Sequence, residues 1–141
     1  MSPVKQTGHA VYDLKYHFVW IPKYRKLILK GSVAEEGLKE IFEGIAGRYE
    51  MEIDTLEVMP NHVHLFLLAP PKYSPSQVVQ ILKSVSAREV FRRYPWLRKK
   101  LWGVELWGDG CFARSVEDEV TAEVIRRYIT LQYIDQLRLD L

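Results

Sequence analysis

Two strand-like segments joined by a tight turn constrain the fold of this chain more than any other feature. Residues 51–59 (MEIDTLEVM) alternate apolar and acidic side chains, which is the pattern of a half-buried strand. Pro60 and Asn61 signal a turn. Residues 62–69 (HVHLFLLA) contain an unbroken apolar run, which favours a strand near the centre of a sheet. The sequence therefore predicts a β-hairpin whose second strand lies near the centre of a sheet.

A third strand is predicted ahead of this hairpin. Residues 11–21 (VYDLKYHFVWI) are rich in aromatic and β-branched side chains, and Pro22 ends the run. Successive residues of a strand point to opposite faces, so His17 lies on one face and Phe18 and Trp20 lie on the other. The second face carries mostly large apolar side chains.

Two helices are predicted between and after these strands. Residues 33–49 place apolar side chains at helical spacing, with acids on the opposite face. A second helix begins at Ser74 or Ser76, since serine is a favoured N-cap, and runs to about Tyr94. Pro95 ends it.

The last part of the chain predicts a bent strand and a final helix. Residues 104–115 include Gly108 and Gly110, so we expect an interrupted strand there. A helix follows from about residue 119 to residue 137. The order is then β-α-β-β-α-β plus a C-terminal helix, an α+β ferredoxin-like (RRM-like) fold with an antiparallel sheet and both internal helices on one face. We expect one domain over residues 1–141. Proteins of many different functions share this architecture, so the fold alone does not indicate a function.

Composition excludes several classes of protein. The chain has 141 residues, of which 48% are hydrophobic and 27% are charged, as in an ordinary globular domain. Its longest apolar run, residues 65–69, is far shorter than a membrane helix, and the polar first ten residues do not resemble a secretory signal. The single cysteine, Cys111, favours a reducing compartment. We therefore expect a cytoplasmic protein with no membrane partner.

Charge is segregated along the chain although the net charge is only +2. Residues 1–30 carry a net charge of +5 and residues 61–100 carry +7, whereas residues 31–60 carry −6 and residues 101–141 carry −4. Two basic blocks suggest a face for a polyanion such as a nucleic acid. The alternative is that acidic and basic blocks pair with each other across the fold.

The sharpest local motif is His62-Val63-His64. Residues two apart in a strand project to the same face, so both imidazoles can converge on one metal ion while Val63 points into the core. Two histidines on a solvated face, or stacked against a helix, would explain the same pattern. A complete site would need a third ligand, and His9 and His17 have no evident pairing with the motif.

The final helix carries a tyrosine and a glutamine four residues apart, Tyr128 and Gln132. Positions i and i+4 share a helical face, so these side chains point in the same direction. Most tyrosines of amphipathic helices belong to a core or an interface. A tyrosine is also a reasonable nucleophile where a metal activates the group that it attacks.

These motifs together resemble a known family, the single-tyrosine HUH (His-hydrophobic-His) transposases of insertion sequences, of the TnpA type in the IS-two-hundred-like group. The resemblance covers nearly the whole chain in the same order. The matching stretches are residues 16–20 (YHFVW) with 23–26 (KYRK), residues 59–64 (MPNHVH), residues 84–88 (SVSAR), residues 106–112, and Tyr128 with Gln132.

The resemblance implies a transposase that moves its element as single-stranded DNA through a 5′-phosphotyrosine intermediate. It implies that His62, His64 and Gln132 hold Mg²⁺ or Mn²⁺ and that Tyr128 is the nucleophile. Tyr133 competes for this role, but its i+4 neighbour is Leu137 rather than a glutamine.

The resemblance also implies a subterminal DNA hairpin as ligand and a homodimer whose active site is shared between subunits. The aromatic strand near the N-terminus could pair edge to edge in such a dimer, or face the two helices instead. Basic residues on or near the first strand and second helix are candidates for DNA contact, although each is also an ordinary surface charge: Lys23, Arg25, Lys26, Lys83, Arg88, Arg92 and Arg93.

Three alternatives remain open on the sequence. A domesticated HUH-tyrosine nuclease acting on chromosomal palindromes would keep the same residues. A non-catalytic nucleic-acid-binding module would place aromatic side chains on its central strands, where this chain carries His62 and His64. A plain metal hydrolase would form no protein–DNA adduct.

Overall fold

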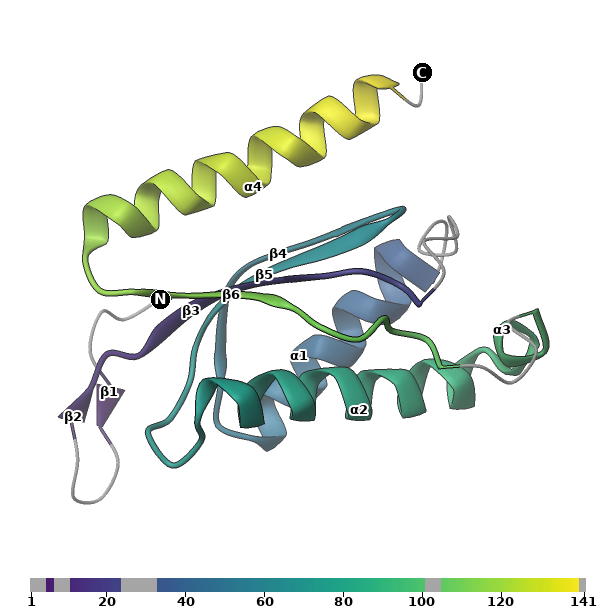
Figure 1. Cartoon of the computed structure of the whole chain (residues 1–141), viewed down its shortest axis with the longest axis horizontal. Helices are drawn as coiled ribbons and strands as arrows, with labels where there is room; N and C mark the ends of the chain where they lie inside the picture. Colours follow the sequence, from purple (N-terminus) through teal and green to yellow (C-terminus); the bar gives the residue numbers. More distant parts are fainter. Residues whose placement is uncertain (1–4, 7–10, 24–32, 101–104, 140–141) are drawn as a thin grey trace.

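A four-stranded antiparallel sheet forms the centre of the computed structural model (Figure 1). The structure describes residues 5–6, 11–23, 33–100 and 105–139. The strands are β3 (Lys15–Trp20), β4 (Glu52–Met59), β5 (His62–Leu68) and β6 (Phe112–Val116), in the spatial order β4-β5-β3-β6. This is the order of the ferredoxin-like fold, so the predicted fold class is confirmed.

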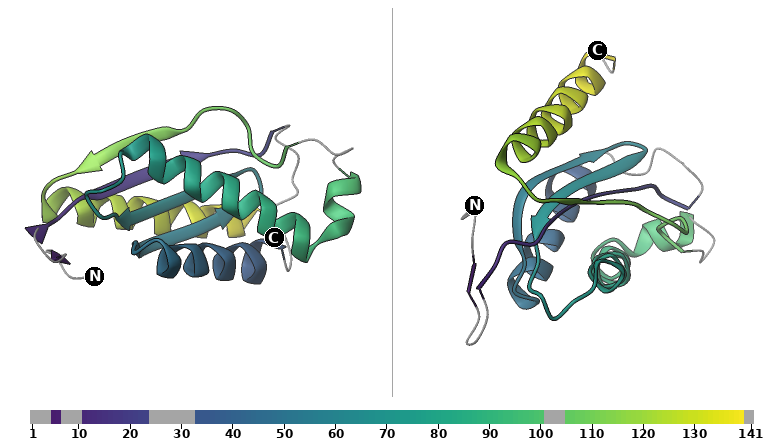
Figure 2. Two further views of the ribbon diagram at one scale, coloured as in Figure 1. Left: turned by 90° about the horizontal axis from the view of Figure 1, so that it is seen from below. Right: turned by 60° about the vertical axis from the view of Figure 1, so that its left-hand side comes forward.

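Two helices cover one face of the sheet (Figure 2). They are α1 (Lys39–Arg48), which continues a π-helical segment η1 (Val33–Leu38), and α2 (Pro75–Arg93). The main core lies between helices and sheet and contains Phe18, Trp20 and Phe42, all buried. Phe18 and Trp20, which share one face of β3, thus belong to this core.

A third long helix, α4 (Glu119–Leu139), lies across the opposite face of the sheet (Figure 1). It packs through Ala122, Ile125 and Ile129 against Phe66 of β5 and Val116 of β6. This second cluster is much smaller than the main core. The face beneath α4 is also the face onto which β5 directs its two histidines.

The alternative that the first strand is a sheet edge is wrong. β3 is bonded on both sides, to β5 and to β6, so its backbone groups are already used. The edge strands of this sheet are β4 and β6. The aromatic side chains of β3 face the two helices, which was the other interpretation.

Sequence patterns predicted most boundaries of the helices and strands. Of the two serines considered for the start of α2, Ser74 is the N-cap. Ser74 Oγ accepts a hydrogen bond from the backbone N–H of Gln77, and Gln77 Oε1 accepts one from the backbone N–H of Ser74. The short helix α3 (Pro95–Lys100) was not expected, but proline fits the first turn of a helix as well as it ends one.

The bent strand predicted over 104–115 is regular only in β6. Ahead of β6, the backbone N–H of Gly108 donates to the carbonyl of Ile21, and the N–H of Lys23 donates to the carbonyl of Leu106. A small hairpin, β1 (Lys5–Gln6) with β2 (Val11–Tyr12), was also not expected. No helix among the described residues is long and apolar enough to cross a membrane.

Candidate active site

Two histidines project from β5 onto the sheet face that α4 covers. His62 and His64 are two residues apart, so the strand places their rings side by side, with centroids 4.8 Å apart and planes nearly perpendicular. His64 is only 3% exposed. Val63 between them is buried in the main core, as expected. The strand therefore mounts both imidazoles rigidly.

A third histidine, which sequence reasoning treated as isolated, joins this pair. His17 of β3 lies with its Nε2 atom 3.3 Å from Nδ1 of His64, and the two rings are stacked with centroids 5.5 Å apart. The one available signal was that His17 falls on the face of its strand away from the core. Burial and the nearby Arg114 guanidinium lower the pKa of His17, so its neutral form is favoured.

His62 is held by its sequence neighbour. Its Nδ1 atom lies 2.6 Å from the side-chain oxygen of Asn61, in the turn between β4 and β5. An amide oxygen can only accept a hydrogen bond, so His62 Nδ1 is the donor. Both histidines of the motif thus have Nδ1 engaged by a neighbouring side chain.

Tyr128 of α4 faces the histidines. Its ring meets the ring of His64 edge to face, with centroids 5.9 Å apart, and its side chain is 49% exposed. A cavity of 570 Å³ lies here, and its walls are His17, Val19, His62, His64, Phe112, Arg114, Val124, Ile125 and Tyr128. The tyrosine predicted as nucleophile and the predicted histidine ligands therefore share one cavity.

Gln132, the third predicted ligand, lies one turn beyond Tyr128 on α4. Its side chain is outside the described part of the structure. Within the described part, no group of three or more His, Cys, Asp or Glu side chains could hold a metal ion.

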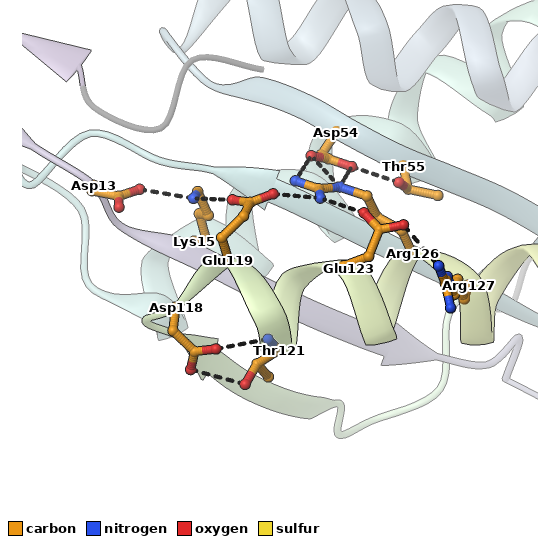
Figure 3. Close-up of polar contacts among 10 residues, drawn as sticks. All are labelled: Asp13, Lys15, Asp54, Thr55, Asp118, Glu119, Thr121, Glu123, Arg126 and Arg127. Carbon is orange, nitrogen blue, oxygen red and sulfur yellow. Dashed lines mark hydrogen bonds and ion pairs between the residues drawn. The ribbon is translucent and has the colours of Figure 1, made fainter.

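Arg126 ties α4 to the edge strand (Figure 3). Its Nε atom donates to both carboxylate oxygens of Asp54, at 2.9 and 3.0 Å, and its Nη1 atom contacts Glu119 at 2.7 Å and Glu123 at 3.2 Å. The guanidinium also lies 5.7 Å from the ring centroid of Phe66. These contacts raise the pKa of Arg126, first through Asp54 and then through Glu119.

Asp54 reaches Arg126 from an irregular position in β4. The register of β4 against β5 shifts between Ile53 and Thr55, so Asp54 sits at a bulge. Burial alone would raise the pKa of Asp54, but hydrogen bonds from Arg126 and Thr55 outweigh it and hold the pKa below its ordinary value. The Asp54–Arg126 pair was not identified from the sequence, because the partners are 72 residues apart.

Many charges of the segregated blocks pair with each other, which was the alternative to a polyanion face. Lys15 contacts Glu119 at 3.6 Å and Arg93 contacts Glu40 at 2.8 Å. Figure 3 shows how Asp13, Lys15, Glu119, Arg126 and Asp54 form one continuous chain of ion pairs beneath α4. Part of the charge pattern therefore serves the fold.

Several of the residues predicted to contact DNA make contacts within the protein itself. Lys83 donates to the carbonyls of Gly108 (2.6 Å) and Gly110 (3.0 Å), and Lys23 lies 3.7 Å from Asp109. Arg92 donates from Nε to Glu89 at 3.1 Å, and Arg93 contacts Glu40 at 2.8 Å. Arg88 is exposed on α2.

Arg25 and Lys26 lie outside the described residues. Lys83 and Lys23 thus help to hold the segment before β6, whereas Arg88 is the candidate most available to a ligand. A role in DNA contact stays a prediction for all seven residues.

The fold and the site together define a class: a ferredoxin-like domain with a His-hydrophobic-His strand and a tyrosine on a helix that packs over it. The family model described as Transposase IS200 like matches residues 10–132. This chain belongs to that family of transposases.

Individual relatives agree with this assignment. The chain is 44% identical over 130 residues to the ISDra2 transposase TnpA of Deinococcus radiodurans, covering 92% of this chain and 91% of the relative. It is 28% identical over 116 residues to the transposase for insertion sequence element IS200 of Salmonella typhimurium, covering 82% and 76%.

Solved structures show the same fold. A crystal structure of a transposase candidate from D. radiodurans R1 matches with a TM-score of 0.72 and 40% identity, covering 92% of this chain and 98% of the other. A REP-associated tyrosine transposase bound to a REP hairpin matches with a TM-score of 0.64 at 14% identity, covering 96% and 74%. At that identity the second match shows the fold alone.

Proposed function

We propose that this transposase binds hairpins at the ends of an insertion sequence and cleaves and rejoins single-stranded DNA through a covalent bond to Tyr128. The observation that carries the proposal is the placement of the Tyr128 ring against His64 at a shared cavity. No other described tyrosine lines that cavity.

The proposed chemistry places the scissile phosphate of the DNA beside the phenol of Tyr128. The Tyr128 oxygen attacks the scissile phosphorus and loses its proton, and a new P–O bond joins the protein to the 5′ side of the DNA. The bond from phosphorus to the 3′ oxygen breaks, and that oxygen leaves as a 3′-hydroxyl after taking a proton. Phenolate is a better leaving group than an alkoxide, so another 3′-hydroxyl can later reverse the step without an external energy source.

A divalent cation would support this chemistry, and adjacent histidines are ligands that such an ion can use. We propose Mg²⁺ or Mn²⁺, bound by His62, His64 and the amide oxygen of Gln132. The adjacent imidazoles with engaged Nδ1 atoms fit such a role, since each would then ligate through Nε2. When bound, the cation would neutralise charge that develops on the scissile phosphate.

Hairpin recognition is proposed from the relatives and from charge. The REP-associated tyrosine transposase of the same fold was solved with a REP hairpin bound. Residues 61–100 of this chain carry a net charge of +7, and Arg88 is exposed there. Basic residues on one face bind phosphates with little dependence on sequence.

A homodimer with a shared active site is part of the same proposal. In this structure Tyr128 contacts His64 of its own chain. Sharing between subunits would therefore require α4 to leave this face of the sheet, which breaks its contact with Asp54. We further propose that the protein acts in the cytoplasm of a bacterial or archaeal cell, in line with its bacterial relatives.

The test uses single-stranded oligonucleotides copied from the DNA that flanks this gene, incubated with Mg²⁺ or Mn²⁺. A denaturing gel and peptide mass spectrometry should detect a covalent adduct at Tyr128. The adduct should disappear with EDTA, with double-stranded DNA, and in Tyr128→Phe. Tyr133→Phe is the matched control on the same helix and should keep it.

Two outcomes would contradict the proposal. An adduct that persists in Tyr128→Phe would assign the nucleophile elsewhere. Tight hairpin binding without any adduct would indicate a binding protein instead of a strand-transfer enzyme.

A further inference from the structure

His17 makes a specific contact with the metal-binding motif although it lies outside it. It is 5% exposed on β3, the strand that is bonded on both sides. The neighbours of its ring are His64, which is stacked on it, and Phe112, which meets it edge to face at 5.8 Å. Arg114 is its cross-strand partner on β6. A side chain so enclosed has little freedom to turn away from His64.

In the 3.3 Å contact between His17 Nε2 and His64 Nδ1, one nitrogen carries the proton and the other accepts the hydrogen bond. If the proton belongs to His64, then His64 donates from Nδ1 and its Nε2 atom carries a lone pair that can bind a metal. If the proton belongs to His17, then a neutral His64 is protonated on Nε2 and cannot ligate through that atom. The position of this proton therefore decides whether His64 can serve as a ligand.

His62 shows which arrangement the site uses. Asn61 accepts from His62 Nδ1, so the proton of the neutral His62 ring is on Nδ1 and its Nε2 is the nitrogen with the lone pair that a metal would need. The corresponding arrangement at His64 is donation from Nδ1 to His17.

We propose that His17 is a positioning residue whose Nε2 accepts the Nδ1–H of His64 and thereby holds His64 with Nε2 as its metal-binding atom. The inference rests on the metal site put forward under Proposed function. Metal-binding histidines usually donate their other N–H to a carboxylate, a backbone carbonyl or water, and losing that partner typically weakens metal binding by about 10–100-fold. Here another imidazole, fixed on a central strand, would fill this role.

A matched pair of substitutions separates the hydrogen bond from packing. His17→Phe keeps a ring against His64 and Phe112 but offers no acceptor. His17→Gln loses the ring but places an amide oxygen close to the original Nε2 position. Ser74→Ala, at the remote N-cap of α2, is a control for a general loss of stability.

The first readout is the tautomer of His64 in the metal-free protein. Long-range nitrogen–proton NMR of the imidazoles at about pH 8, where an ordinary imidazole is neutral, should find His64 protonated on Nδ1 in the wild type and in His17→Gln. In His17→Phe the Nε2–H form should become substantial. His64 protonated on Nε2 in the wild type would overturn the proposal without any variant.

The second readout is Mn²⁺ affinity without DNA. We expect His17→Phe to bind Mn²⁺ about 10–100-fold more weakly than the wild type, with His17→Gln recovering most of the loss and Ser74→Ala unchanged. Equal affinity in wild type and His17→Phe would overturn the positioning role. Absence of Mn²⁺ binding by the wild type would instead refute the metal site itself, while the NMR result would still decide which nitrogen of His64 carries the proton.

Discussion

The contact between Asp54 and Arg126 gives the most specific stability prediction, because it joins α4 to the rest of the fold. Asp54→Asn keeps the size of the side chain but removes its charge and one of its two acceptor oxygens. The side chain of Asp54 is 7% exposed and that of Arg126 is 24% exposed. The pair is thus neither a surface ion pair nor a fully buried one.

The free-energy cost of Asp54→Asn should lie between the values for exposed and for buried ion pairs. Exposed ion pairs contribute about 0–1 kcal/mol, and removing one partner of a buried pair costs about 3–5 kcal/mol. Arg126 keeps Glu119 and Glu123 after the substitution, so its charge is not left alone. We therefore expect Asp54→Asn to weaken the docking of α4 by about 2 kcal/mol, or about 30-fold in the docking equilibrium.

Hydrogen exchange measures this effect where it should occur. Amides of Ile125 and Ile129, which lie on the face of α4 that packs on the sheet, should exchange about 30-fold faster in Asp54→Asn, whereas amides of Val63 and Leu65 in β5 should change much less. Glu123→Gln removes an exposed partner of the same guanidinium and should change exchange by less than about 2-fold. Unchanged exchange at Ile125 and Ile129, or an equal change throughout the sheet, would refute the idea that this contact holds the helix.

Two further predictions concern pH and helix capping. Because the pKa of Asp54 is lower in the folded protein than in the unfolded chain, its contribution to stability is full above its ordinary pKa of 3.8 and is lost as the pH falls through the folded-state pKa. The stability difference between wild type and Asp54→Asn, measured by urea unfolding, should therefore shrink below about pH 4; a difference that stays constant to lower pH would contradict the assignment. Ser74→Ala should destabilise the protein by about 1 kcal/mol in the same assay and Ser74→Asp should not, since only alanine removes the acceptor at the N-cap of α2; equal losses in both would show that capping is not the cause.

The order of strands and helices could be predicted from local patterns. The β4–β5 hairpin follows from alternation and a turn signal, and the limits of α2 follow from a serine cap and a terminal proline. These features depend on neighbours within a few residues, so the sequence contains all of the relevant information. The helix α3 was missed because Pro95 satisfies two local rules at once.

The candidate site could be predicted only in part, because some of its features depend on local geometry and others on long-range packing. His62 and His64 share a face because of strand geometry alone, and Tyr128 with Gln132 follows from helix periodicity. Which face of the sheet α4 covers is a matter of long-range packing, so the meeting of Tyr128 with His64 required the structure.

Local patterns along the chain were therefore enough to predict the main strands and helices and the histidine pair, and the order of its motifs resembles the family to which the transposase belongs. The contact of His17 with His64 and that of Asp54 with Arg126 arose from folding. His17 and His64 are 47 residues apart in the sequence, and the sheet order brings them within hydrogen-bonding distance. Asp54 and Arg126 are 72 residues apart, and the docking of α4 brings them together. Hydrogen bonds act over about 3 Å, so contacts between residues this far apart in the sequence cannot be predicted from local sequence patterns.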